Sequence, residues 1–313
     1  MKVCILGAGA LGCSIGGALV DAGSQVWLIN RAQDHVAAIN SHGLRMREGG
    51  HERIVRARAA IDCHGIGPAD LVIVLVKSFD TASAIADAAP IIGPQTVVMS
   101  LQNGLGHEEV LAAAVGLSRI VAGKTYVGGV LLGPGHVLGG TRGKQTIVGE
   151  LDGRISARVQ AIAAEFNRAG LETILSDNIV GTMWDKLLVN VSTGALAAIT
   201  GLAYGALYDV AAVEATAIAA VAEAMAVAQA LGVRLSIEAP QQAWTMAAAG
   251  LSADFRTSML QSLDKGSITE IDYINGAVVR EGERLGIATP VNRTLVACIK
   301  GIERRLADAG AAP

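Results

Sequence analysis

The first half of the chain alternates short apolar runs with amphipathic segments, a pattern that predicts strands and helices in turn. The expected strands are Lys2–Leu6, Ser24–Ile29, Asp70–Val76, Thr96–Leu101, Ile120–Val127, Thr146–Gly149 and Glu172–Ser176, with shorter ones at Gly43–Met46, Glu52–Ala59 and Gly135–Gly139. Among the expected helices are Thr81–Ala89 and Ser156–Ala169. Continuous apolar runs such as Asp70–Val76 are typical of central strands in a parallel sheet. The pattern therefore predicts a doubly wound α/β sheet.

The second half of the chain follows a different period. From Asn178 onward, helical spacing and Ala-rich stretches dominate, as in Val213–Leu231. The apolar positions of that stretch recur on more than one helix face, which is typical of a largely buried helix. We therefore expect two domains, an α/β domain over residues 1–177 and an all-α domain over residues 178–313.

Composition narrows the function classes. The 313 residues include 25 Lys and Arg against 28 Asp and Glu, a formal net charge of −3, with no basic stripe. This balance offers no electrostatic footprint for nucleic acid, so we expect no nucleic-acid partner. The segment Leu187–Tyr208 is uncharged, yet it carries Asn190, Thr193 and several glycines, so we expect a core helix and no membrane partner.

The cysteines indicate neither a disulfide framework nor a metal site. Cys4, Cys13, Cys63 and Cys298 form no C-x-x-C pair. Because no charged and apolar leader precedes the first strand, we expect a cytoplasmic protein.

A glycine-rich turn directly follows the first expected strand, and its sequence is Gly7-Ala8-Gly9-Ala10-Leu11-Gly12. Gly7 permits a tight turn, Gly9 lets the backbone approach phosphates, and Gly12 lets the next helix pack close to the strand. The free N–H groups at the start of that helix would face the negative charge. The spacing, with a strand before it and a helix after it, predicts a Rossmann-type dinucleotide site.

The end of the second strand indicates which dinucleotide binds. Asn30 and Arg31 stand where a carboxylate would bind the ribose 2′-hydroxyl of NAD, and the sequence offers no carboxylate there. A guanidinium suits a 2′-phosphate, so we expect NADP(H) as the cofactor. Lys77 and Asn103 follow two other apolar strands, at the sheet edge where ligands bind in such folds.

Polar residues of the helical half form a second candidate group. Lys186 and Asn190 are four residues apart and share one helix face. The stretch Ser258–Gly266 is expected to end a helix, and Glu270 to lie in the first turn of another. Taken singly, Lys186 fits a solvated helix lysine and Glu270 a carboxylate that favours a helix N-terminus.

Taken together, these residues resemble the ketopantoate reductase family, in the same order and over nearly the full length. The matching motifs are Gly7-x-Gly9-x-x-Gly12, Asn30-Arg31, Leu75-Val-Lys77, Leu101-Gln-Asn-Gly104, Trp184-x-Lys186-x-x-x-Asn190, Ser258 with Gly266, and Thr269-Glu270-Ile with Ile274-Asn-Gly276. The resemblance implies NADPH-dependent reduction of 2-dehydropantoate, a small 2-oxo acid, to (R)-pantoate on the route to coenzyme A.

The resemblance also implies roles for the residues of the helical half. Lys186 would be the acid that the ketone oxygen needs as hydride arrives at its carbon. Glu270 would hydrogen-bond the substrate and help set the protonation of Lys186. Ser258 would hold the substrate carboxylate, and Asn190 would orient the substrate.

Two further roles concern the cofactor. Asn103 would bridge the nicotinamide ribose and the substrate. Lys77 would help Arg31 at the adenosine phosphate end.

The sequence departs from the family pattern at Gly194, where many members carry a second asparagine four residues after Asn190. This leaves a second enzyme open, a reductase of another 2-oxo acid or a 3-hydroxy acid dehydrogenase with the same plan. A catalytically silent NADP(H)-binding redox sensor is a third interpretation, but cofactor binding alone requires neither Lys186 nor Glu270. The Ala-rich half could also bury part of its surface against a second copy, as a homodimer.

Overall fold

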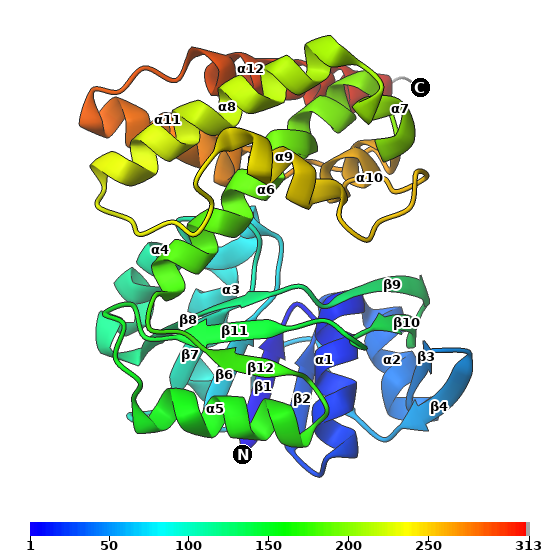
Figure 1. Cartoon of the computed structure of the whole chain (residues 1–313). Helices are drawn as coiled ribbons and strands as arrows, with labels where there is room; N and C mark the ends of the chain where they lie inside the picture. The colour runs from blue at the N-terminus through cyan, green and yellow to red at the C-terminus, as the bar shows by residue number, and fades with distance from the viewer. Residues whose placement is uncertain (311–313) are drawn as a thin grey trace. The chain divides into compact units, whose positions relative to one another are not determined.

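The chain folds into two compact units, seen in a computed structural model that describes residues 1–310 (Figure 1). One unit comprises Met1–Gln102 and His107–Ile179, and the other comprises Asn103–Gly106 and the chain from Val180 onward. The first unit is built of helices and sheets and the second of helices, which confirms the expected fold class.

A mixed eight-stranded sheet forms the centre of the α/β unit, in the order β12-β11-β8-β7-β6-β1-β2-β5. Its strands are β1 Lys2–Leu6, β2 Gln25–Ile29, β5 Arg58–Ala60, β6 Leu71–Val74, β7 Val97–Ser100, β8 Ile120–Thr125, β11 Thr146–Gly149 and β12 Thr173–Leu175. All neighbours pair in parallel except β8 and β11, which are antiparallel. The carboxyl ends of β1, β2, β6 and β7 therefore lie at the same edge, as the sequence predicted.

A second, four-stranded sheet was not expected from the sequence. It consists of β4 His51–Val55, β3 Leu44–Glu48, β10 His136–Gly140 and β9 Gly128–Gly133, in that spatial order. The stretch Glu52–Ala59, expected as one strand, is split between this sheet and β5 of the main sheet, because a turn at Arg56 interrupts it. Alternation of apolar residues predicts a strand but not the sheet that it joins.

Helix α1 packs against both sheets of the α/β unit through small residues. A Cβ at Gly16 would lie 2.5 Å from Leu28 Cδ2 of the main sheet, and one at Gly17 would meet Met46 of the smaller sheet. Helix α5 has the same length as α1, 12 residues, and the remaining helices of the unit are shorter. The helices and 3₁₀ turns are α1 Ala10–Asp21, α2 Gln33–His42, η1 Ser78–Asp80, α3 Thr81–Asp87, η2 Ala89–Ile91, α4 His107–Val115, η3 Leu117–Arg119 and α5 Ala157–Arg168.

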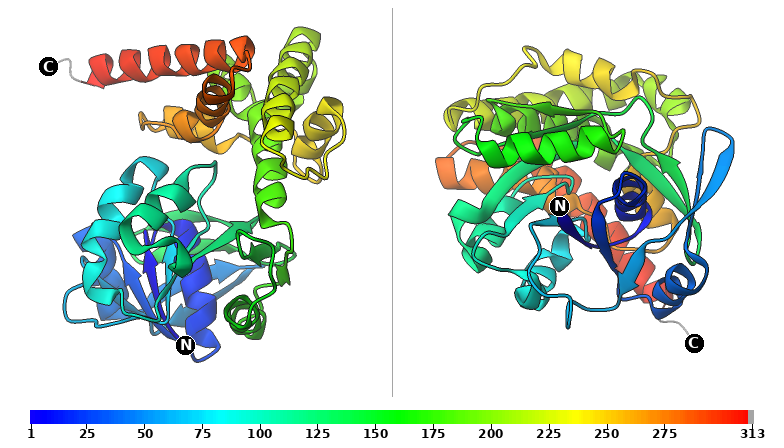
Figure 2. Two further views of the ribbon diagram at one scale, coloured as in Figure 1. Left: turned by 90° about the vertical axis from the view of Figure 1, so that its left-hand side faces the viewer. Right: turned by 90° about the horizontal axis from the view of Figure 1, so that it is seen from below.

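The helical unit packs its alanines and leucines into one core, and α12 is a long straight helix along the edge of this unit, which contributes Leu295 and Ile299 to the core (Figure 2). Its elements are α6 Ile179–Thr200, α7 Tyr204–Tyr208, α8 Ala211–Ala230, α9 Pro240–Ala248, α10 Ser258–Asp264, η4 Ile271–Tyr273, α11 Asn275–Leu285 and α12 Pro290–Gly310. The uncharged stretch Leu187–Tyr208 is divided after Thr200, where Gly201 adopts φ +72°.

Helix α8 is long and apolar enough, by length and composition alone, to cross a membrane. It is the one such helix within residues 1–310. Alanine and valine positions of α8 are nevertheless buried in the core of the helical unit, among them Ala217, Ala220, Val221 and Ala224. Only 39% of its apolar window is buried, however, so the expectation of a largely buried helix is wrong: α8 is buried along one face alone.

The turn between β1 and α1 generates a stability prediction. Gly7 adopts φ +93°, and a Cβ there would lie 2.6 Å from the Leu75 carbonyl carbon, whereas a Cβ at Gly9 would have no atom within 4 Å. We expect Gly7→Ala to lower the free energy of unfolding by at least about 2 kcal/mol, because it combines backbone strain with a backbone clash. Gly9→Ala should cost no more than about 1 kcal/mol. Urea unfolding of both variants beside the parent measures the difference, and equal losses would contradict it.

Candidate functional site

The glycine loop after β1 forms an open, uncapped helix N-terminus. A Cβ at Gly12 would lie 2.6 Å from the Gly7 carbonyl oxygen, so the first turn of α1 packs tightly on the loop. Gly9 is the N-cap residue of α1 and provides no side-chain cap, so the first N–H groups of the helix, at Ala10 and Leu11, have no intrahelical acceptor. Unfilled space at Gly9 beside these donors is the arrangement that binds a phosphate group.

Asn30, at the end of β2, holds this loop in place. Its Nδ2 donates to the Ala8 carbonyl oxygen at 2.9 Å, and its Oδ1 accepts from the Ala32 N–H at 2.9 Å. The thiol of Cys13 donates to the same Ala8 oxygen at 3.3 Å. The side chain of Asn30 therefore joins the glycine loop to the β2–α2 turn.

Arg31 pairs with a carboxylate that the sequence did not suggest. Arg31 Nη2 lies 3.0 Å from Asp80 Oδ2, and the Arg31 side chain is 74% exposed. The expectation that no carboxylate is available at the end of β2 is therefore wrong: Asp80 reaches this place from η1, which follows β6. Lys77 is exposed just before η1. Both cations are accessible to an anion, but Arg31 must leave or share Asp80 to bind one.

Helix α6 presents the polar face that the sequence predicted. Lys186 and Asn190 are both partly buried, and Gly194 follows them one turn further along the same face. Gly194 is buried, yet the nearest atom to a Cβ there would be Met259 Cε, at 3.8 Å. The face therefore has room for a Cβ at Gly194, in van der Waals contact with Met259 of α10.

Ser258 begins α10, and this helix ends at Asp264, within the stretch Ser258–Gly266 that was expected to end a helix. Thr257 is the N-cap residue, and its hydroxyl accepts from the Leu260 N–H at 3.3 Å. A buried Thr cap and the apolar residues after it start the helix at this point, which periodicity alone did not reveal. Ser258 is exposed in the first turn, so its hydroxyl is accessible to a ligand.

Glu270 lies just before the 3₁₀ turn η4 and not in an α-helix, so its expected place in a first helical turn is wrong. The α-helix begins only at Asn275, because Ile274 has non-helical dihedral angles, φ −106° and ψ −94°. The segment is fixed on one side by Glu303, whose Oε1 accepts from both the N–H and the hydroxyl of Thr269, each at 2.7 Å. Glu270 itself is partly buried.

The segment Asn103–Gly106 joins this second group. The Leu105 N–H donates to the Tyr273 carbonyl oxygen at 2.9 Å, and Gly104, with φ +91°, packs against the same residue. Asn103 is therefore in the same unit as Glu270, although it follows strand β7 in the sequence.

The predicted site residues thus fall into two groups. The helical unit holds Asn103, Lys186, Asn190, Ser258 and Glu270, and the α/β unit holds the glycine loop, Asn30, Arg31 and Lys77.

Sequence reasoning missed three buried polar residues near the Asn103 segment, namely Gln102, Glu108 and Lys124. Gln102 Nε2 donates to the Val76 carbonyl oxygen at 2.8 Å, and the Lys124 ammonium donates to the Gln102 carbonyl oxygen at 2.8 Å. Lys124, the one charged residue of strand β8, was the signal available in the sequence.

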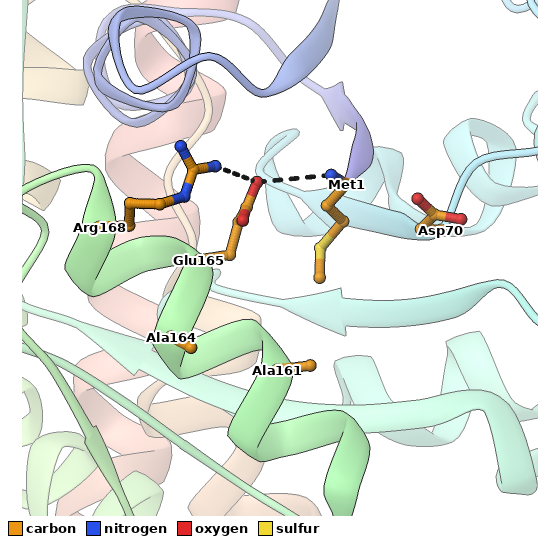
Figure 3. Close-up of a pocket in the computed structure, with 6 residues that line it drawn as sticks. All are labelled: Met1, Asp70, Ala161, Ala164, Glu165 and Arg168. Atoms are coloured by element: carbon orange, nitrogen blue, oxygen red, sulfur yellow. Dashed lines mark ion pairs between the residues drawn. The ribbon is translucent and has the colours of Figure 1, made fainter.

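A pocket of about 490 Å³ lies at the other end of the α/β unit, beside the amino end of β1 (Figure 3). Three of its charged groups pair with one another, since Glu165 lies 3.6 Å from the amino group of Met1 and 2.8 Å from Arg168, and the fourth, Asp70, accepts from the Lys2 N–H at 2.7 Å. Because β1 carries its glycine loop at the opposite end, this pocket is separate from the candidate site. Within residues 1–310, no group of three His, Cys, Asp or Glu side chains is placed to hold a metal ion.

Comparisons with known proteins point to one family over nearly the whole chain. The family profile described as "Ketopantoate reductase PanE/ApbA" matches residues 3–153, and "Ketopantoate reductase PanE/ApbA C terminal" matches residues 178–303. The 2-dehydropantoate 2-reductase of Halobacterium salinarum is 36% identical, over 97% of this chain and 99% of its own length. That of Pyrococcus horikoshii is also 36% identical, over 97% and 98%.

Solved structures show the same likeness. A PanE/ApbA family ketopantoate reductase from Ralstonia eutropha superposes with a TM-score of 0.90 at 37% identity, over 98% of this chain and 100% of its own. A D-mandelate dehydrogenase in a ternary complex with NADH and anilino(oxo)acetate superposes with a TM-score of 0.91 at 29% identity, over 98% and 100%. From its two matching profiles and its full-length relatives, the chain belongs to the ketopantoate reductase family of oxidoreductases.

Proposed function

We propose that this protein reduces 2-dehydropantoate to (R)-pantoate with NADPH, on the route to pantothenate and coenzyme A. The observation that carries the proposal is the grouping of Lys186, Asn190, Ser258, Glu270 and Asn103 in one unit of a family member. Relatives named 2-dehydropantoate 2-reductase, 36% identical over nearly the whole chain, support this substrate.

The α/β unit fits a dinucleotide phosphate. Gly9 leaves space beside the unpaired N–H groups of α1, so the pyrophosphate would bind at this helix N-terminus. Arg31 and Lys77 are the cations for a 2′-phosphate, which supports NADP(H) over NAD(H). When bound, the nicotinamide supplies the hydride.

The helical unit supplies the protein's share of the chemistry. Negative charge grows on the ketone oxygen during reduction, and the ammonium of Lys186 would stabilise that charge and donate a proton to the oxygen. The Glu270 carboxylate would accept a hydrogen bond from a substrate hydroxyl. The Ser258 hydroxyl would donate a hydrogen bond to the substrate carboxylate, and Asn190 would orient the substrate from the same helix face as Lys186.

A second enzyme function is favoured by Gly194. The space at this glycine would admit a bulkier substituent than that of 2-dehydropantoate, and Met259 gives it an apolar border. The similar D-mandelate dehydrogenase was solved with anilino(oxo)acetate, a 2-oxo acid with an aromatic group. The alternative is thus reduction of an aryl- or alkyl-bearing 2-oxo acid on the same residues. The relatives named as reductases argue against a catalytically silent redox sensor.

The cellular compartment and the oligomeric state of the enzyme stay predictions. We infer that it works in the cytoplasm. A homodimer stays an expectation from the Ala-rich helical half.

Arg31→Ala should weaken NADPH binding about tenfold and leave NADH binding unchanged, because the exposed guanidinium acts on the 2′-phosphate alone. Asp80→Asn is the matched control: it removes the carboxylate that holds Arg31 and should strengthen NADPH binding. Fluorescence titration gives all the dissociation constants. Equal affinities of the unmutated protein for NADPH and NADH would contradict the cofactor assignment.

Lys186→Ala should lower kcat for NADPH-dependent reduction of 2-dehydropantoate by about 10² to 10⁴ and retain NADPH affinity, because it removes the proton donor and leaves α6 intact. Asp185→Ala is the control on the same helix. Asp185 accepts from the Ser236 and Ile237 N–H groups, so its loss should lower Tm but keep kcat within a few-fold. A Lys186→Ala enzyme as active as the control would remove Lys186 from the mechanism.

Gly194→Asn should lower KM for 2-dehydropantoate about threefold to tenfold, the value of one added hydrogen bond, since a Cβ there would meet no atom closer than 3.8 Å and the amide would extend from the Asn190 face. Gly194→Ala fills part of the same space without a polar group and should not tighten binding. If both substitutions change KM alike, space and not hydrogen bonding matters at this position. Initial-rate measurements on the two variants decide between these results.

A further inference from the structure

Lys124 is a fully buried lysine in a site that the proposed chemistry does not use. Its side chain is 1% exposed, and every residue of β8 around it is buried. Removing an ammonium group from water costs several kcal/mol unless partners compensate for it. One partner is the main-chain oxygen of Gln102, to which the Lys124 ammonium donates at 2.8 Å.

Gln102 is itself held at every polar group of its side chain. Its Nε2 donates at 2.8 Å both to the Val76 carbonyl oxygen and to the Thr81 hydroxyl, and its Oε1 accepts from Ser100 Oγ at 3.1 Å. The group of Gln102 that accepts from Lys124 is its main-chain carbonyl oxygen. That carbonyl belongs to the peptide bond that leads to Asn103.

The peptide bond is planar, so fixing the Gln102 oxygen also fixes the direction in which Asn103 leaves it. The segment Asn103–Gly106 is then held a second time, where the Leu105 N–H donates to the Tyr273 carbonyl oxygen at 2.9 Å. Beyond the segment, buried His107 contacts Ser78 Oγ at 2.9 Å. Asn103 thus lies between two main-chain anchors, and Lys124 provides the first.

A second buried charge accompanies Lys124. Glu108, 5% exposed, lies in the first turn of α4 directly after the segment. Burial raises the pKa of Glu108 to about 7, and the Lys124 charge opposes that rise. Two buried opposite charges can often be replaced together by apolar residues without loss of stability, so stability alone does not account for the presence of Lys124 and Glu108.

We propose that Lys124 is a positioning residue for Asn103: its ammonium group fixes the Gln102–Asn103 peptide so that the Asn103 side chain is held ready for the nicotinamide ribose and the substrate. The inference rests on the proposed function, in which Asn103 makes those contacts. Lys124 touches neither cofactor nor substrate in this role and acts through the main chain.

A double-mutant cycle tests this role. Lys124→Met and Asn103→Ala are made singly and together, and the NADPH dissociation constant and kcat for 2-dehydropantoate are measured for each. If Lys124 acts through Asn103, Lys124→Met weakens NADPH binding or lowers kcat at least about threefold in the parent, and has almost no further effect once Asn103 is alanine. Effects that multiply, or the absence of an effect from either single substitution, would overturn the proposal.

Thr96→Val is the matched control for a loss of stability. Thr96 is buried before the opposite end of β7, where its hydroxyl donates to the Ala69 carbonyl oxygen at 2.6 Å and accepts from the Gly93 N–H at 2.8 Å. It should lower Tm, and any effect on binding should multiply with that of Asn103→Ala. Should Lys124→Met fail to fold, the cycle is run with Lys124→Met and Glu108→Gln together, which removes both charges.

The two proposals fail in different ways. If the unmutated protein binds NADPH but does not reduce 2-dehydropantoate, the proposed function fails, and the cycle on the NADPH dissociation constant still decides the role of Lys124. If 2-dehydropantoate is an efficient substrate and the effects multiply, the function stands and the positioning role is overturned.

Discussion

The close approach of Gly104 to Tyr273 is the constraint on which the candidate site depends. Gly104 adopts φ +91°, and a Cβ there would lie 2.8 Å from the Tyr273 carbonyl carbon, so any side chain would be both strained and blocked. The contact makes Asn103 part of the helical unit and fixes the far end of the Glu270 segment at the same time. A loop that follows strand β7 thereby contributes a polar residue to a group otherwise carried by α6, the first turn of α10 and the residue before η4.

The proposed activity divides between two kinds of local structure. The α/β unit offers main-chain donors at an uncapped helix N-terminus together with surface cations, which suit a charged, extended cofactor. The helical unit offers one lysine, one carboxylate and short polar side chains, which suit a small acid whose ketone oxygen must gain a proton. The hydrophobic cores of these units consist mainly of alanine, valine, leucine and isoleucine.

Features that depend on local spacing were predictable from the sequence. The glycine loop and the shared face of Lys186 and Asn190 follow from fixed periods of strand and helix, and the structure has both. Features that depend on tertiary contacts were not predictable. Asp80 contacts Arg31 because the turn after β6 and the end of β2 lie at the same edge of the folded sheet. Glu270 lies outside an α-helix because Ile274 has non-helical dihedral angles and α11 begins only at Asn275.

The proposed substrate is tested most directly by kcat/KM of the unmutated protein with NADPH across a panel of 2-oxo acids. The panel includes 2-dehydropantoate, its analogue without the hydroxyl group, and an aromatic 2-oxo acid. The account predicts the highest kcat/KM for 2-dehydropantoate, with a loss for the analogue because a hydrogen-bond partner is left unpaired. A higher kcat/KM for the aromatic acid, or equal values for 2-dehydropantoate and its analogue, would contradict it.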